Sequence, residues 1–183
     1  SSLNVVNTEF LVGGKLGSNG LFTLESGALL TNTGASASFI LGSDSGSIGS
    51  ATISGAGTTA TLYDAFVGIS SGGDNRLVVS NSAVVTTTDV FVVGQAAGGK
   101  GIMTISSGAD VTTSGDTFIG NSGTGALTID GSGYTYTGST VLVGNAAGSV
   151  GSLTLSSGGT IDAATVTVQQ TGSTFNADII AIG

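Results

Sequence analysis

Short apolar stretches that end in glycine recur along the chain at nearly constant spacing. Each has two or three apolar residues before the glycine, as in FVVG and VLVG. Successive glycines lie 24 to 29 residues apart, and a seventh copy, Val166–Val168, ends in Gln169 instead. A fixed period of about 26 residues indicates a repeat architecture. The six glycines are Gly13, Gly42, Gly68, Gly94, Gly120 and Gly144.

Each period carries two further strand patterns after this anchor stretch. The second alternates apolar and polar residues, as in Met103-Thr104-Ile105, and the third holds pairs such as Val111-Thr112. Alternation with β-branched residues is typical of strands. Because each strand type recurs once per period, like strands should stack on like. This predicts an all-β parallel β-solenoid of about seven coils, each coil adding about 4.8 Å.

Stacking of equivalent positions predicts rows of core side chains along the solenoid. The corners between second and third strands contain Ser-Gly, and we expect Gly108 and Gly158 to adopt positive φ there. The first predicted row is Phe22, Ala51, Leu77, Met103, Leu127 and Leu153, and the second is Leu24, Ile53, Val79, Ile105, Ile129 and Leu155.

Composition narrows the possible functions. The chain has 33 glycines and no proline, cysteine, histidine or tryptophan, and no change in composition divides residues 1–183 into more than one domain. Without histidine and cysteine, the usual zinc sites and histidine-based triads are excluded. We therefore predict no enzyme activity, no cofactor and no metal centre.

The charge balance disfavours several partners. The formal net charge is −8, and the basic residues are only Lys15, Arg76 and Lys100. Binding to a phosphate backbone needs clustered basic residues, so nucleic acid is not an expected partner. Polysaccharide-acting β-helices also need basic residues beside carboxylates, so this activity is kept only as a minor alternative. No apolar run reaches the length of a membrane span, so no membrane insertion is expected.

Two polar patterns suggest possible sites. Asp64, Asp89 and Asp116 precede the anchor stretch of successive coils and could form an acidic row, which we interpret as turn chemistry with weak calcium binding as an alternative. The third strands carry Thr-x-Thr or similar pairs, an arrangement by which some β-solenoids bind ice, although Thr59-Ala60-Thr61 is expected to fall out of register. The pairs are Thr31/Thr33, Thr86/Thr88, Thr112/Ser114 and Thr137/Ser139.

The anchor strands are apolar at alternate positions on both faces. One face should fill the core, and the other should form an exposed apolar stripe that packs against another copy or another strand layer. The predicted stripe is Leu11, Ile40, Phe66, Val92, Phe118 and Leu142.

The two ends of the chain carry complementary parts of a coil. Leu3–Val6 reads as a third strand without its first two, and Phe175–Ile182 reads as a second strand without a third. Stacked head to tail, one chain would complete the next through β-strand addition. The expected interface residues are Leu3, Val5, Phe175, Ile179 and Ile180.

Two stretches carry a family resemblance: VGQAAGGKGIMTISSGADV (Val93–Val111) and VGNAAGSVGSLTLSSGGTI (Val143–Ile161). They resemble the autotransporter-associated, or PEP-CTERM-associated, β-helix repeats of bacterial surface proteins. The resemblance implies a right-handed parallel β-helix and export to the cell surface, usually as a passenger stalk or adhesin.

These observations lead to one expected function and one main alternative. We expect a non-catalytic extracellular structural β-solenoid that assembles head to tail into a filament. The alternative is a segment of a long adhesin or autotransporter passenger stalk.

Overall fold

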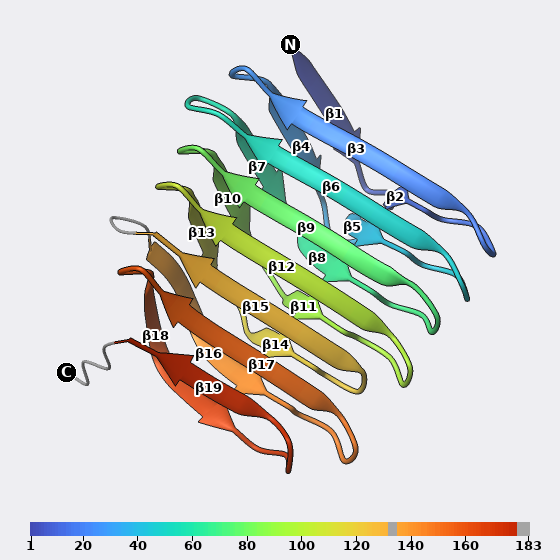
Figure 1. The fold of residues 1–183 in the computed structure, drawn as a ribbon. Helices are drawn as coiled ribbons and strands as arrows, with labels where there is room; N and C mark the ends of the chain where they lie inside the picture. The colour runs from blue at the N-terminus through green and yellow to red at the C-terminus, as the bar shows by residue number, and fades with distance from the viewer. Residues whose placement is uncertain (132–134, 179–183) are drawn as a thin grey trace.

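The computed structural model describes residues 1–131 and 135–178, and of residues 135–138 only the backbone. Its regular structure consists of nineteen β-strands. Among the residues described, no helix is long and apolar enough to span a membrane. The chain winds from one end of the stack to the other, so that β1 and β19 lie at opposite ends (Figure 1).

The strands form three faces of a parallel β-solenoid of about six turns. One face is a seven-stranded sheet of second strands, which we call the long face. It contains β3 (Asn19–Glu25), β6 (Ile48–Ser54), β9 (Asp74–Ser80), β12 (Lys100–Ser106), β15 (Thr124–Asp130), β17 (Val150–Ser156) and β19 (Thr174–Ala177).

The other two faces join into one twelve-stranded sheet, because β16 (Thr135–Val143) and β18 (Thr160–Val168) run through the corner between them. The anchor face contains β2 (Phe10–Val12), β5 (Ser38–Leu41), β8 (Asp64–Val67), β11 (Phe91–Val93) and β14 (Thr117–Ile119). The third face contains β1 (Ser2–Val6), β4 (Leu29–Thr33), β7 (Thr59–Leu62), β10 (Val84–Thr87) and β13 (Asp110–Thr113).

Pairing between neighbouring coils confirms both predicted core rows. Ala51 pairs with Leu77, Leu77 with Met103, and the row continues through Leu127 and Leu153. Met103 and Ile105 are fully buried in the middle of the stack. The anchor strands follow the same rule, since Phe91 and Val93 point inward and are also fully buried. Inward-facing apolar residues from all three faces therefore form one continuous core.

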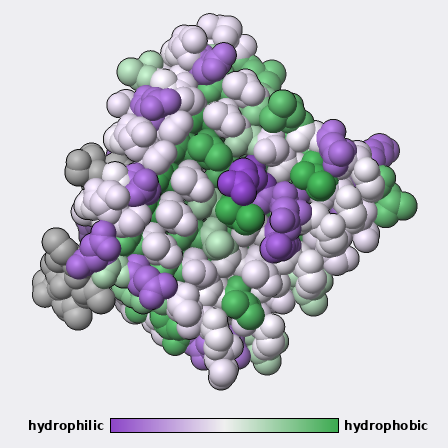
Figure 2. Space-filling model, in the orientation of Figure 1, coloured by the Kyte–Doolittle hydropathy of each residue, from purple (hydrophilic) through white to green (hydrophobic). Residues whose placement is uncertain are grey.

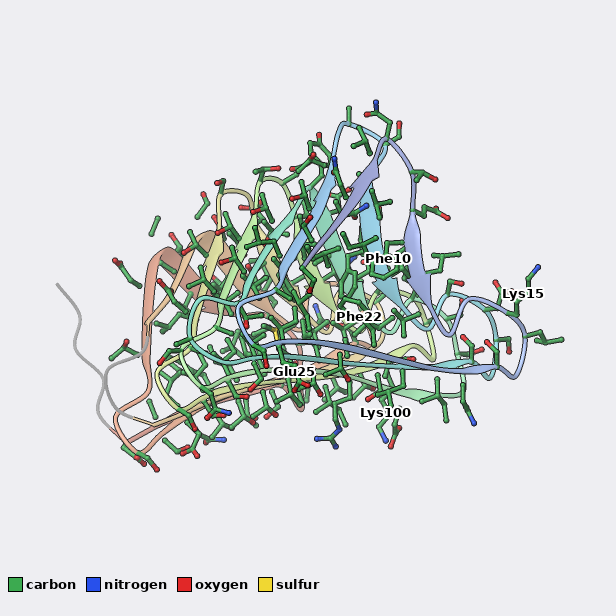
Figure 3. The ribbon with its side chains drawn as sticks, turned by 90° about the horizontal axis from the view of Figure 1, so that it is seen from above. Phe10, Lys15, Phe22, Glu25 and Lys100 are labelled. Carbon is green, nitrogen blue, oxygen red and sulfur yellow. The ribbon has the colours of Figure 1, made fainter. Side chains whose placement is uncertain are left out.

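The corner between anchor and second strands projects from the solenoid and is closed by paired glycines. Lys15 lies in the outermost part of this corner in the first coil (Figure 3). A Cβ atom on Gly101 would lie 2.7 Å from the backbone nitrogen of Gly94, and one on Gly151 would lie 2.5 Å from that of Gly144. Only glycine allows the two backbones to pass so closely. Gly101 and Gly151 are therefore required by a close contact between two backbone segments.

Asn75 replaces the second glycine of the pair in one coil. It pairs in register with Gly101 and is fully buried. Its Oδ1 accepts a hydrogen bond from the Gly49 N–H at 2.7 Å, and its Nδ2 donates to the Gly73 carbonyl at 3.0 Å. The amide thus satisfies backbone groups that would otherwise be buried without a partner, which offsets the cost of burying a polar side chain.

The Ser-Gly corners have the backbone geometry that the sequence predicted. Gly108 has φ of 75° and Gly158 has φ of 82°, and the serines before them, Ser107 and Ser157, are also at positive φ. Two successive residues with positive φ characterise a type I′ turn. One corner achieves this without glycine, through Asn81 at 56° and Ser82 at 63°.

We expect Gly101→Ala to lower the free energy of unfolding by about 3 kcal/mol or more, because the new methyl group would overlap backbone atoms that cannot move aside. Gly148→Ala is the matched control, since no atom lies within 4 Å of the place that its Cβ would take and only its φ of 80° opposes the change. The control should cost about 1 kcal/mol. Urea unfolding midpoints check both values, and equal losses would show that the glycine pair is not a steric requirement.

We expect two substitutions at the type I′ corners to change the stability of the protein in opposite directions. Ser82→Gly should stabilise the protein by about 0.5–1 kcal/mol by removing a strained non-glycine φ, whereas Gly108→Val should cost about 1–3 kcal/mol. Thermal melts of the two variants measure these shifts. A Gly108→Val variant that melts with the parent would mean that this corner relaxes to a conformation open to any residue.

Candidate functional site

The two ends of the solenoid carry unpaired strand edges and incompletely buried core positions. In residues 1–131 and 135–178, the strands β1, β2 and β3 at the N-terminal end pair only with the coil that follows them, and β18 and β19 at the C-terminal end pair only with the coil that precedes them. Edges of this kind can accept a further strand through backbone hydrogen bonds. Neither end is covered by a helix or another segment among the described residues.

Phenylalanines stand at both ends of one core row. Phe22 starts the row Phe22–Ala51–Leu77 and Phe175 extends it beyond Leu153, and both rings are only partly buried although they pack against the core. Phe22 makes an edge-to-face contact with Phe10, with ring centroids 5.1 Å apart, and both rings point toward the interior in Figure 3. Within the described part of the chain, the core is therefore open at each end.

The other predicted end residues fit this picture in part. Leu3 is 42% exposed and Val5 is half-buried on β1. Ile179 and Ile180 lie outside the described residues. Exposed large apolar side chains are concentrated in the first coil, where Leu16 and Leu21 are each 78% exposed.

The predicted apolar stripe forms a continuous row in register, but it is not uniformly exposed. Leu11 pairs with Ile40, Ile40 with Phe66, and the row continues through Val92 and Phe118 to Leu142. Ile40 and Val92 are only 4% and 2% exposed. The expectation of a continuous exposed stripe was wrong, because two of its six members are buried. Val92 has a phenylalanine on each side of it in the row, Phe66 and Phe118.

The threonine row on the third face is more regular than expected. Thr61 pairs with Thr31 on one side and Thr86 on the other, so the expectation that this segment is out of register was wrong. The row continues through Thr112 to Thr137 and ends at Asp162. The adjacent outward position holds Tyr63 in the coil of Thr61, so paired threonines do not repeat along the face.

The three aspartates do not form a single row. Asp64 and Asp116 occupy equivalent positions with Val90 between them, whereas the Asp89 N–H bonds to the Tyr63 carbonyl, one position earlier. Among the residues described, no three acidic side chains come close enough to hold a metal ion. Burial raises the pKa of Asp64, with a smaller opposing effect from the Val90 N–H, and the negative charge of Asp89 raises the pKa of Tyr63.

Two basic residues lie near one carboxylate on the long face. The Lys100 Nζ is 2.8 Å from Asp74 Oδ1, and Arg76 follows two residues later on the same strand as Asp74. Both partners of this ion pair are at least half exposed, so it contributes little to stability. The face of the molecule seen in Figure 2 is mostly of neutral hydropathy, with scattered hydrophilic and hydrophobic side chains. A single exposed carboxylate does not provide the acid and base pair of a glycosidase.

An amide row lines the corner that follows the anchor glycines. Asn121 Nδ2 donates to Gln95 Oε1 at 3.0 Å, and Asn145 Nδ2 donates to Asn121 Oδ1 at 2.7 Å. The sequence contained a signal for this row, since Gln95, Asn121 and Asn145 each directly follow an anchor glycine. Stacked amides of this type stabilise in-register parallel strands.

Comparison of the chain with family models, with curated proteins and with solved structures finds no match to any of them.

We expect two aspartates to respond oppositely to pH. The pKa of Asp64 is raised, so its charged form costs stability at neutral pH, and Asp64→Asn should raise the melting temperature at pH 7. Hydrogen bonds from Ser156 and Ser157 lower the pKa of Asp130, so Asp130→Asn should lower the melting temperature at pH 7.

Both effects should weaken between pH 7 and about pH 3. The Asp64 effect should be lost once the pH is below the ordinary aspartate pKa of about 3.9, whereas part of the Asp130 effect should remain because the pKa of its carboxyl is lowered in the folded state. Melting curves at the two pH values provide the check. A shift of the same sign in both variants at pH 7 would contradict the assigned environments.

Proposed function

We propose that this protein is a non-catalytic structural β-solenoid that assembles head to tail into a filament outside the bacterial cell. The observation that carries the proposal is the match between its two ends. Each end presents the same faces of the solenoid with unpaired strand edges and a half-buried phenylalanine of the same core row. Contact between ends would bury these apolar side chains, which is favourable at about 25 cal/mol per Å² of apolar surface removed from water.

Stacking of a second copy would continue the internal register. The β3 strand of the next copy would lie on β19, which places Phe22 of that copy beside Phe175, and its β2 strand would lie on the Val166–Val168 part of β18. Because this contact joins different surfaces, it does not close and produces a linear polymer. The resemblance of Val93–Val111 and Val143–Ile161 to surface β-helix repeats supports the extracellular location.

The alternative is that the solenoid is a segment of a surface stalk. The same open ends would then be covered by further coils of the same polypeptide, and the apolar row around Phe66 would serve at most as a lateral contact with another chain or strand layer. The two functions differ in one measurable property, because only the filament proposal requires residues 1–183 to associate with themselves.

The test uses substitutions that place a charge in the joint. Leu3→Lys alters the N-terminal end and Val168→Lys, at a side chain 43% exposed, alters the C-terminal end. Val84→Lys, at a side chain 37% exposed in the middle of the rod, is the matched control. Sedimentation velocity and electron microscopy should show filaments of the parent and the control, and monomers of either end variant.

A mixture of the two end variants gives the sharpest result. Leu3→Lys keeps an intact C-terminal end and Val168→Lys keeps an intact N-terminal end, so the mixture should form dimers and nothing larger. A parent chain that stays monomeric at every concentration tested would overturn the filament proposal and favour the stalk. Filaments that survive both end substitutions would show that the ends are not the contact.

A further inference from the structure

One outward row at the edge of the long face contains three of the eleven acidic residues of the chain. The row is Glu25, Ser54, Ser80, Ser106, Asp130, Ser156 and Asp178, as the strand pairings and their extension by one residue define it. Within the chain, each acidic residue has serine as its neighbour in the row. Ser156 Oγ donates to Asp130 Oδ1 at 2.8 Å, and the Ser157 N–H donates to Asp178 Oδ2 at 2.9 Å.

Head-to-tail stacking would break this separation at a single place. Ala177 and Leu24 occupy the same core row, so a second copy placed in register brings its Glu25 directly opposite Asp178. Both side chains are exposed, and the coil spacing separates their strands by about 4.8 Å. None of the three basic residues lies in β1, β2, β3, β18 or β19, so no lysine or arginine of these strands neutralises the pair.

We propose that Asp178 and Glu25 of a second copy form a charge gate at the end-to-end joint, which makes filament growth depend on ionic strength. This inference rests on the proposed function. Like charges directly opposite on neighbouring strands destabilise the pairing, while the apolar rows beside them favour it. Repulsion between exposed charges weakens as salt rises, because the screening length falls to about 3 Å at 1 M. Growth should therefore be slow in dilute buffer and faster in salt.

The test reverses the charge at each side of the joint separately and then at both. Glu25→Lys and Asp178→Lys each create an opposite pair at the joint, whereas the double variant places two lysines there and restores repulsion. Asp110→Lys, on the exposed start of β13 in the middle of the rod, is the control for overall charge. Each single variant changes the formal net charge from −8 to −6, and the double variant changes it to −4.

We expect that the association constant does not rise steadily as the net negative charge of the variants falls. At low salt, each joint variant should associate about five-fold more tightly than Asp110→Lys, a factor that corresponds to the upper range for opposite charges on neighbouring strands. The double variant should fall back below both singles although it carries the least net charge. Sedimentation velocity at low salt and at 1 M salt measures these constants, and the differences should vanish at high salt.

The outcomes of this experiment distinguish failure of the charge-gate proposal from failure of the filament proposal. If the parent and all variants stay monomeric in 1 M salt, the filament proposal fails and the gate with it. If filaments form but the three single variants associate equally, or the double variant associates most tightly, then net charge alone acts and only the gate is overturned. Circular dichroism spectra that match the parent confirm that each variant is folded.

Discussion

The rest of the structure depends on one constraint, the in-register parallel pairing of each strand with its equivalent in the next coil. Every position then has a copy of its own environment about 4.8 Å above and below it. Apolar side chains form core rows under this rule, and threonines and amides form surface rows. Like charges at successive positions of such a row destabilise the strand pairing most. The chain is accordingly poor in charge, with 8% charged residues, and the acids in the row from Glu25 to Asp178 are separated by serine.

Much of this architecture could be predicted from the sequence because it follows from periodicity. The anchor stretches, the alternation around Met103 and Ile105, and the positive φ of Gly108 and Gly158 are all local patterns that repeat. Local patterns were less informative where turn length varies. The register of Thr61 was predicted wrongly because the corner before its strand is one residue longer than the corner before the strand of Thr86. A register counted along the chain without this extra residue is shifted by one position.

The other features that the sequence did not predict depend on contacts between neighbouring coils. The low exposure of Ile40 and Val92 cannot be predicted from one strand, because it depends on what the neighbouring coils place beside them. The glycine pairs are visible in the sequence as two glycines five or seven residues apart, but their contact needs the three-dimensional path of the corner. The presence of Asn75 in a glycine position is likewise explained only by its hydrogen bond with the Gly49 N–H of the preceding coil.

The glycine pairs also isolate the projecting corners from the core. Gly120 and Gly125 close their corner with only four residues between them, whereas Gly94 and Gly101 have six, yet the strands on both sides stay in register. Corner length is thus decoupled from coil geometry, and the closure costs little entropy as a loop grows. Peptides inserted at these corners would be displayed as a ladder with the spacing of the coils. The molecule is in this sense a scaffold whose surface loops are free to diversify while its core is unchanged.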